Sequence, residues 1–188
     1  RPALAAGLEA QSRYVESILA AYASPSKPDL KEFGEIRASA RLARSNAEAV
    51  VERMLTEPRT RDTMTPRTAG GIVGAIRRNA LAALSLHAGL EHDGRGGLPG
   101  VQALASQAAS SLMTLATAVR EHTVPPRFPL LRQAQLALAT AANDVVSDET
   151  NLIVDSIDTM AELLEKERTS PQGAPALNID VARVPQAF

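Results

Sequence analysis

Three arginines have the residue type and the spacing for ion pairing along one side of a helix. Arg37, Arg41 and Arg44 follow one another at intervals of four and three residues, so their side chains stack one turn apart. Like charges at this spacing disfavour an isolated helix by about 0.2–0.5 kcal/mol per pair. Glu48 follows Arg44 by four residues, but a base before an acid is the weaker orientation. We therefore expect this arginine row either to be offset by groups outside its helix or to be a solvated face.

An acidic series near the C-terminal end of the chain is the second candidate for ion pairing. Its acids repeat about every 3.5 residues, and residues 133–165 hold seven acids and no base. The series is Asp144, Asp148, Asn151, Asp155, Asp158, Glu162 and Glu165. We hypothesise that it pairs with a basic surface on a neighbouring helix or subunit, and a solvated acidic face is the alternative. Exposed pairs contribute only about 0–1 kcal/mol each, so pairing would set register and orientation more than stability.

The near-zero net charge of −1 hides two halves of opposite sign. Residues 1–78 carry 13 basic and 9 acidic side chains, which gives +4, whereas residues 79–188 carry 7 and 12, which gives −5. A dipolar chain of this kind suits pairing between its own surfaces. Because there is no global basic signal, we expect no nucleic-acid partner.

Catalytic and metal-binding patterns are not found in the sequence. His87, His92 and His122 do not form a pair at metal-ligand spacing on one helix, and no nucleophile elbow occurs. The glycine-rich stretch 94–97 does not contain the Lys-Ser/Thr of a phosphate-binding loop. We therefore predict a protein that is not an enzyme, with no catalytic residue, no metal and no cofactor.

His87 raises one alternative from another functional class, a histidine phosphotransfer module. A phosphoacceptor histidine is normally followed by a basic and a small residue, whereas Ala88 and Gly89 follow His87 here. His87 also belongs to the apolar face of its predicted helix, so we expect a hydrogen-bonded core histidine. Asn46 and Asn79 are polar residues inside predicted helices, and each either hydrogen-bonds across an interface to set register or is exposed.

Composition favours an all-α fold. Hydrophobic residues make up 45% of the chain, but aromatic residues only 3%, and the apolar residues are mainly alanine and leucine, which are strong helix formers. Without cysteine, the chain has no disulfide framework and no thiolate metal site. No stretch reaches the roughly 18 consecutive apolar residues that a membrane-spanning helix needs. Since the chain begins with Arg1, we expect it to be part of a longer protein.

Apolar periodicity predicts an antiparallel bundle of about five helices over residues 1–168, followed by an extended or disordered tail over residues 169–188. Two helices are expected at Pro2–Tyr22 and Asp29–Glu57, and three more are expected to open at Thr65-Pro66, Pro99 and Pro129. No glycine or proline interrupts the last one, so we expect it to continue, or to bend gently, through Ser147–Thr150. On this reading Val145 and Leu152 face the core.

Five arginines lie on or near the connection between the helix that ends at Glu57 and the helix that opens at Thr65-Pro66. They suggest that a membrane surface is nearby. They are Arg59, Arg61, Arg67, Arg77 and Arg78. Basic residues beside a membrane favour its anionic cytoplasmic leaflet by about 1 kcal/mol each, so an anionic membrane surface is a possible partner. The alternative is an ordinary polar connection.

The most recognisable stretch of the chain is the segment 41–58. It has the pattern Arg-x-Ala-Arg-x-Asn-x-Glu-Ala from Arg41 to Ala49, followed by Glu57-Pro58. This pattern resembles the cytoplasmic helical domain of the fusaric acid resistance (FUSC) family of bacterial inner-membrane proteins. A looser similarity continues from the helix that contains Arg77-Arg78-Asn79-Ala80-Leu81 towards Glu121.

The resemblance implies a cytosolic module whose parent protein also has membrane-helix bundles and exports aromatic carboxylic acids or related toxic compounds. It implies no catalytic residue. We therefore expect a domain at the cytoplasmic face of the bacterial inner membrane that packs against copies of itself and couples to its own membrane-spanning region. A stand-alone signalling or scaffold domain is the alternative. The candidate interface residues are Arg37, Arg41, Arg44, Asn46, Glu48, Asp144, Asp148, Asp155 and Asp158.

Overall fold

The computed structural model describes residues 1–24, 30–56, 64–93, 97–140, 142 and 144–169. Within these residues the chain forms six helices and no strand, so the predicted all-α class is confirmed. The helices are α1 (Pro2–Ala23), α2 (Leu30–Thr56), α3 (Pro66–Asp93), α4 (Val101–Glu121), α5 (Pro129–Ala139) and α6 (Asp144–Thr169). The predicted tail lies outside the described residues, except for Thr169, which still belongs to α6.

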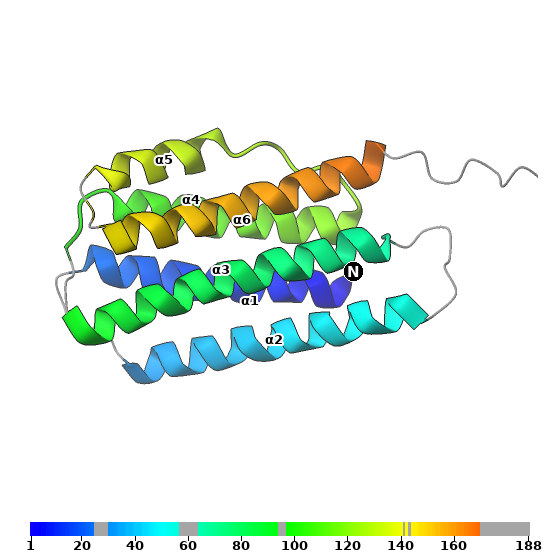
Figure 1. Cartoon of the computed structure of the whole chain (residues 1–188), viewed down its shortest axis with the longest axis horizontal. Coiled ribbons are helices and arrows are strands. Elements are labelled where there is room, and N and C mark those ends of the chain that lie inside the picture. The colour runs from blue at the N-terminus through cyan, green and yellow to red at the C-terminus, as the bar shows by residue number, and fades with distance from the viewer. Residues whose placement is uncertain (25–29, 57–63, 94–96, 141, 143, 170–188) are drawn as a thin grey trace, which may run out of the picture.

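Consecutive helices run in alternating directions along the long axis of the bundle (Figure 1). Four of them, α1, α3, α6 and α4, pack as a ring in which each contacts the next. The two others lie at opposite edges of this ring: α2 packs on α1 and α3, and α5 packs on α4 and α6. The molecule is therefore a four-helix bundle in which α1 and α3 run one way and α4 and α6 the other, with one additional helix on each edge.

The apolar stripes predicted for α1, α3 and α4 all face the core. In α1 and α4 every residue of the predicted stripe is buried, from Leu4 to Tyr22 and from Val101 to Val119. The α3 stripe from Ile72 to Leu90 is buried as well, including the polar His87. Alanine occupies many of these positions, so neighbouring helix backbones can approach closely. Burial of such stripes is the main stabilising contribution to a bundle of this kind.

The second helix is amphipathic, as predicted, but its buried edge is narrow. Phe33, Ala40 and Ala47 are buried against α1 and α3, and Ile36 and Met54 are partly covered. The opposite side of α2 is exposed, including Leu42 and Leu55 at 64% and 69% exposure. The predicted ends Asp29 and Glu57 lie outside the described residues.

The prediction of one continuous last helix is wrong, because the chain turns back between α5 and α6. Thr140 ends α5, where its hydroxyl donates to the Ala137 carbonyl at 2.8 Å. The helix α6 then runs without a break through 147–150, as expected for that segment. The turn changes the phase of the apolar pattern, so Val145 and Leu152 are exposed at 58% and 47% instead of facing the core.

Glu167 near the end of α6 closes the start of α3. One of its carboxylate oxygens accepts from the Thr65 backbone N–H at 2.6 Å, and the other accepts from the Thr65 and Thr68 hydroxyls at 2.8 and 2.5 Å. A carboxylate is favoured at a helix N-terminus, where backbone N–H groups lack partners within the helix. Thr65 and Pro66 start α3 as predicted, but the acid that completes the cap comes from about 100 residues later in the chain.

Candidate functional site

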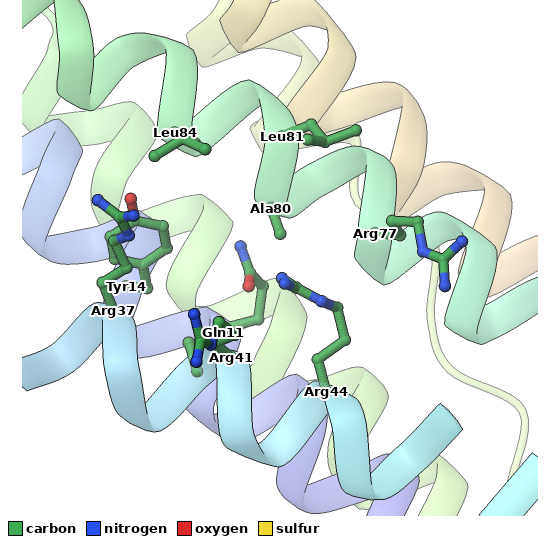
Figure 2. A pocket seen from close by; sticks show the side chains of 10 residues that line it. Gln11, Tyr14, Arg37, Arg41, Arg44, Arg77, Ala80, Leu81 and Leu84 are labelled. Atoms are coloured by element: carbon green, nitrogen blue, oxygen red, sulfur yellow. The ribbon is translucent and has the colours of Figure 1, made fainter. Parts of the chain in front are cut away.

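A small pocket opens where α2 and α3 cross over α1 (Figure 2). Its volume is about 120 Å³. Gln11 and Tyr14 of α1 form the floor. The wall from α2 consists of Arg37, Ala40, Arg41 and Arg44, and the wall from α3 consists of Arg77, Ala80, Leu81 and Leu84. Four guanidinium groups and a few apolar side chains therefore surround one hollow.

Small residues create this pocket. Ala40 and Ala80 are buried at 3% and 8% exposure where α2 and α3 face each other. Because neither side chain extends beyond Cβ, the space between the two helices above α1 is not filled. The spacing of Arg37, Arg41 and Arg44 then places all three guanidinium groups over that space. The row predicted from the sequence is thus a wall of the pocket.

The charges of this wall are only partly compensated. Glu48, four residues after Arg44, binds Arg77 of α3 at 2.8 Å rather than an arginine of its own helix. This hydrogen bond, together with the negative charge of Glu48, raises the pKa of Arg77 above its ordinary value. Among the described residues, no acceptor or carboxylate lies within bonding distance of the Arg37, Arg41 or Arg44 guanidinium. The row therefore has no counter-charge from the part of the chain that is described.

The floor of the pocket presents a buried hydrogen-bond acceptor. Gln11 is only 1% exposed, and its Nε2 donates to Asn79 Oδ1 at 2.9 Å. Asn79 in turn donates through Nδ2 to the Ile153 carbonyl at 3.3 Å and to Ser156 Oγ at 3.0 Å. The other amide atom, Gln11 Oε1, has no hydrogen-bond donor among the described residues. The sequence pattern identified Asn79 as a possible register residue, but Gln11 was not among the predicted site residues.

His87 is a core residue and does not face the pocket entrance. Its Nδ1 lies 3.3 Å from the Tyr14 hydroxyl, and its ring contacts the ring of Phe33 with 5.7 Å between centroids. With 5% exposure, the imidazole is poorly placed to meet a phosphoryl donor. This geometry agrees with the predicted hydrogen-bonded core histidine.

Within the acidic series, one part is paired inside the chain and another is not. Arg132 of α5 donates to Asp155 at 2.7 Å, to Asp158 at 2.6 Å and to Asn151 at 2.8 Å. A basic group on a neighbouring helix thus binds two of the predicted acids. Asp144 and Asp148 are exposed and have no ion pair with any described residue.

The remaining predicted interface residues are dispersed. Asn46 is exposed on α2, away from the core network around Asn79. Arg67 lies in the first turn of α3, but Arg77 and Arg78 lie about three turns further along it. These two arginines therefore lie inside α3, at a distance from the connection before it. Arg59 and Arg61 lie outside the described residues.

A wider groove of about 600 Å³ lies between residues 125–129 and the second half of α6. Arg127, Arg132 and Lys166 line it together with Asp158, Glu162 and Glu165. Because three basic and three acidic side chains line this groove, their formal charges cancel and favour neither an anionic nor a cationic ligand.

None of the helices in the described ranges is long and apolar enough to cross a membrane. Across the same residues, histidine and carboxylate side chains nowhere gather in threes at a distance suited to a metal ion. Comparison of the chain with family models, curated proteins and solved structures gave no match in any of the three.

Proposed function

We propose that this chain is a non-enzymatic assembly domain that pairs with a second copy of itself. The observation that carries the proposal is that the arginine row of α2 and two exposed acids of α6, Asp144 and Asp148, have no counter-charge within the described part of the chain. The arginine row of α2 lies on one side of α3, and the exposed Asp148 of α6 lies on the other. The helix α3 separates the two, since it packs on both α2 and α6 (Figure 1).

Exposed leucines lie on α3 and α6, the helices next to and carrying these charged groups. Leu81 and Leu84 of α3 are 61% and 38% exposed beside the arginines, and Leu152 of α6 is 47% exposed. Leu152 is level with the middle of α3, because the next residue, Ile153, accepts a hydrogen bond from Asn79. Burial of such side chains contributes about 25 cal/mol for each Å² of apolar surface removed from water. The leucines would supply most of the affinity.

The arrangement suits a two-fold symmetric pair. A two-fold axis places the same surface of both copies in contact, so that the arginine row of one copy meets the exposed acids of α6, Asp148 among them, of the other. The charge pairs would contribute little energy each but would fix the orientation of the partner. The leucines of both copies would then meet in the middle.

The FUSC-like pattern of α2 supports a more specific setting for the same domain. In that setting it lies at the cytoplasmic face of a bacterial inner membrane, is joined to its own membrane-spanning region, and holds copies of an exporter of aromatic carboxylic acids or related compounds together. Arginines such as Arg67 would then favour an anionic membrane surface. A stand-alone scaffold or signalling domain would share the self-pairing but not the membrane region.

Size-exclusion chromatography with light scattering on charge-reversal variants tests the pairing. We expect the wild type to be a dimer at high micromolar concentration, and Arg41→Glu or Asp148→Lys alone to shift it towards monomer. When the two variants are mixed, the acid introduced in one copy meets the base introduced in the other, so this contact is attractive again with its signs exchanged. The second contact of the same dimer joins the unchanged Asp148 of the first variant to the unchanged Arg41 of the second. The mixture should therefore dimerise again.

The matched control is Arg13→Glu, which changes an exposed arginine on α1 that does not line the pocket. It should leave the dimer unchanged. A wild type that is monomeric at these concentrations would contradict the proposal. So would a mixture of the two variants that stays monomeric while each variant is folded.

A further inference from the structure

We propose that the pocket between α1, α2 and α3 binds a small oxyanion that carries an O–H group of its own. A phosphate that retains a proton and a 2-hydroxycarboxylate share this chemistry. The inference goes beyond the proposed self-assembly, because a single chain supplies every residue of the pocket. It rests on three properties of the pocket: its charge, one buried acceptor and its size.

The charge of the pocket calls for an anion. Arg44 is the least exposed member of the arginine row, and Figure 2 shows it reaching from α2 towards α3 beside Gln11. Its guanidinium has no acceptor within the described part of the chain. Arginine donates through a planar fork of N–H groups, which matches the paired oxygens of carboxylates and phosphates. Bringing like-charged arginines together without an anion is unfavourable.

The buried acceptor calls for a donor on the same ligand. Both Nδ2 donations of Asn79 go to α6, so its Oδ1 is free to accept and Gln11 must present Nε2 to it. The amide orientation of Gln11 is thereby fixed by the core, and Oε1 is the atom left for the pocket that Gln11 lines. A buried acceptor without a donor is destabilising. A bare sulfate or carboxylate oxygen would be repelled there, whereas an O–H would donate.

The size of the pocket suits a compact ligand. A cavity of roughly 10–15 Å³ holds one water molecule, so about 120 Å³ leaves room for a group with several heavy atoms. Leu81 and Leu84 form an apolar border on the α3 side, which would accommodate a short hydrocarbon part but offers it no hydrogen bond. Tyr14 also lines the pocket, but its hydroxyl lies 3.3 Å from His87 Nδ1 and is therefore engaged with the core.

Isothermal titration calorimetry and thermal unfolding with matched anions test the inference. Inorganic phosphate and sulfate have the same shape and similar charge, but only phosphate carries an O–H near neutral pH. At equal ionic strength we expect phosphate to bind and to raise the Tm, and sulfate to bind at least about tenfold more weakly, a difference of about 1.4 kcal/mol. Lactate carries a hydroxyl group that propionate lacks, so these two acids repeat the comparison for carboxylates. The affinities for phosphate and for lactate then show which of the two kinds of ligand the pocket prefers.

Two variants locate the binding. Arg44→Gln should weaken phosphate binding at least about tenfold, because a charge-assisted hydrogen bond is lost. Gln11→Met should remove the preference for phosphate over sulfate; where this core variant fails to fold, the wild-type comparison of the two anions decides the same point. Arg13→Gln on the exposed side of α1 is the matched control and should bind as the wild type does.

Three results would overturn the inference: no binding of either O–H-bearing anion, equal binding of phosphate and sulfate, or unchanged binding in Arg44→Gln. Titrations are made at a concentration where light scattering shows one species, so the result does not depend on self-association. Conversely, a wild type that is monomeric in light scattering but still binds phosphate would contradict the proposed pairing and leave this inference intact. The two proposals can therefore fail separately.

Discussion

The side-chain amide of Gln11 on α1 donates to the side-chain oxygen of Asn79 on α3 across 2.9 Å, and both residues are buried. Asn79 continues the connection to α6 through the Ile153 carbonyl and Ser156. The side chain of Asn79 thus links three core helices, α1, α3 and α6, by hydrogen bonds. Because the same contact sets which atom of Gln11 faces the pocket, the register of the bundle and the chemistry of the pocket depend on each other.

Removing the Asn79 side chain should destabilise the bundle strongly. In Asn79→Ala the Gln11 amide and the Ser156 hydroxyl lose a buried partner, and a small cavity forms. We expect the free energy of unfolding to fall by about 2–3 kcal/mol, measured by urea denaturation. If the loss were below about 0.5 kcal/mol, the network would not fix the core as described.

Asn46→Ala is the matched control for this prediction. Asn46 is also an asparagine inside a helix, but it is exposed and has no hydrogen bond with a described residue. We expect the free energy of unfolding to change by no more than about 0.5 kcal/mol. Because alanine is the better helix former, the expected change is a small increase. The sequence raised the same two possibilities for both residues, and only their burial separates them.

Helix periodicity was enough to predict most of the fold. The stripes from Leu4 to Tyr22 and from Val101 to Val119 repeat every three or four residues, and a stripe of that width must be buried in a bundle. Prolines marked the starts of α3 and α5 correctly, because proline is tolerated in a first helical turn. These signals are local, so they do not depend on how the helices are arranged.

The turn between α5 and α6 could not be predicted in the same way. No glycine or proline marks residues 140–143, and alanine there favours a helix. Tertiary contacts outweigh that preference. Leu131 and Leu138 of α5 are fully buried, and Arg132 reaches Asp155 and Asp158 of α6, which is possible only when the two helices lie side by side. A local sequence pattern carries no information about such stabilising contacts between residues that are far apart in the chain.

The residues of the pocket, too, could be predicted only in part from the sequence. The arginine row is evident in the sequence, since spacing alone places its members on one side of α2. Which residues complete the pocket depends on how α2 crosses α1 and α3, and Gln11 could be recognised only once its second amide atom was seen to lack a donor among the described residues. A buried polar residue inside an apolar stripe is the one signal that the sequence offered.

The carboxylate of Glu167 should make the stability of the domain depend on acid pH. Burial by itself raises the pKa of Glu167, but the hydrogen bonds from Thr68 and Thr65 and the nearby His122 outweigh it, so the pKa is lowered from its ordinary 4.5. A lowered pKa in the folded state contributes stability that is present above pH 4.5 and is lost as the pH falls through the folded-state value.

Glu167→Gln should therefore lower the free energy of unfolding by about 1–3 kcal/mol at neutral pH and reduce its further loss below pH 4.5. Urea denaturation at a series of pH values measures both effects. Glu165→Gln, two residues earlier and exposed, is the control and should behave as the wild type does. An acid dependence that is as steep in Glu167→Gln as in the wild type would mean that other carboxylates cause it.

Two glycines in helices should respond in opposite ways to the same substitution. A Cβ at Gly34 of α2 would meet no described atom within 4 Å, so Gly34→Ala should gain about 0.5–1 kcal/mol from helix propensity. A Cβ at Gly89 of α3 would lie 2.7 Å from the Tyr22 hydroxyl, which donates to the Leu86 carbonyl. Gly89→Ala must displace that hydroxyl, so we expect a net loss of about 1–2 kcal/mol.

A double-mutant cycle separates this contact from a general effect on α3. Tyr22→Phe removes the one atom that the Gly89 Cβ would meet, at the cost of one hydrogen bond. In the Tyr22→Phe background, Gly89→Ala should therefore become stabilising, as Gly34→Ala is, and the coupling energy from urea denaturation should exceed about 1 kcal/mol. If the two changes were additive, the loss in Gly89→Ala would arise elsewhere in α3, and the close approach of Tyr22 would not be what requires glycine there.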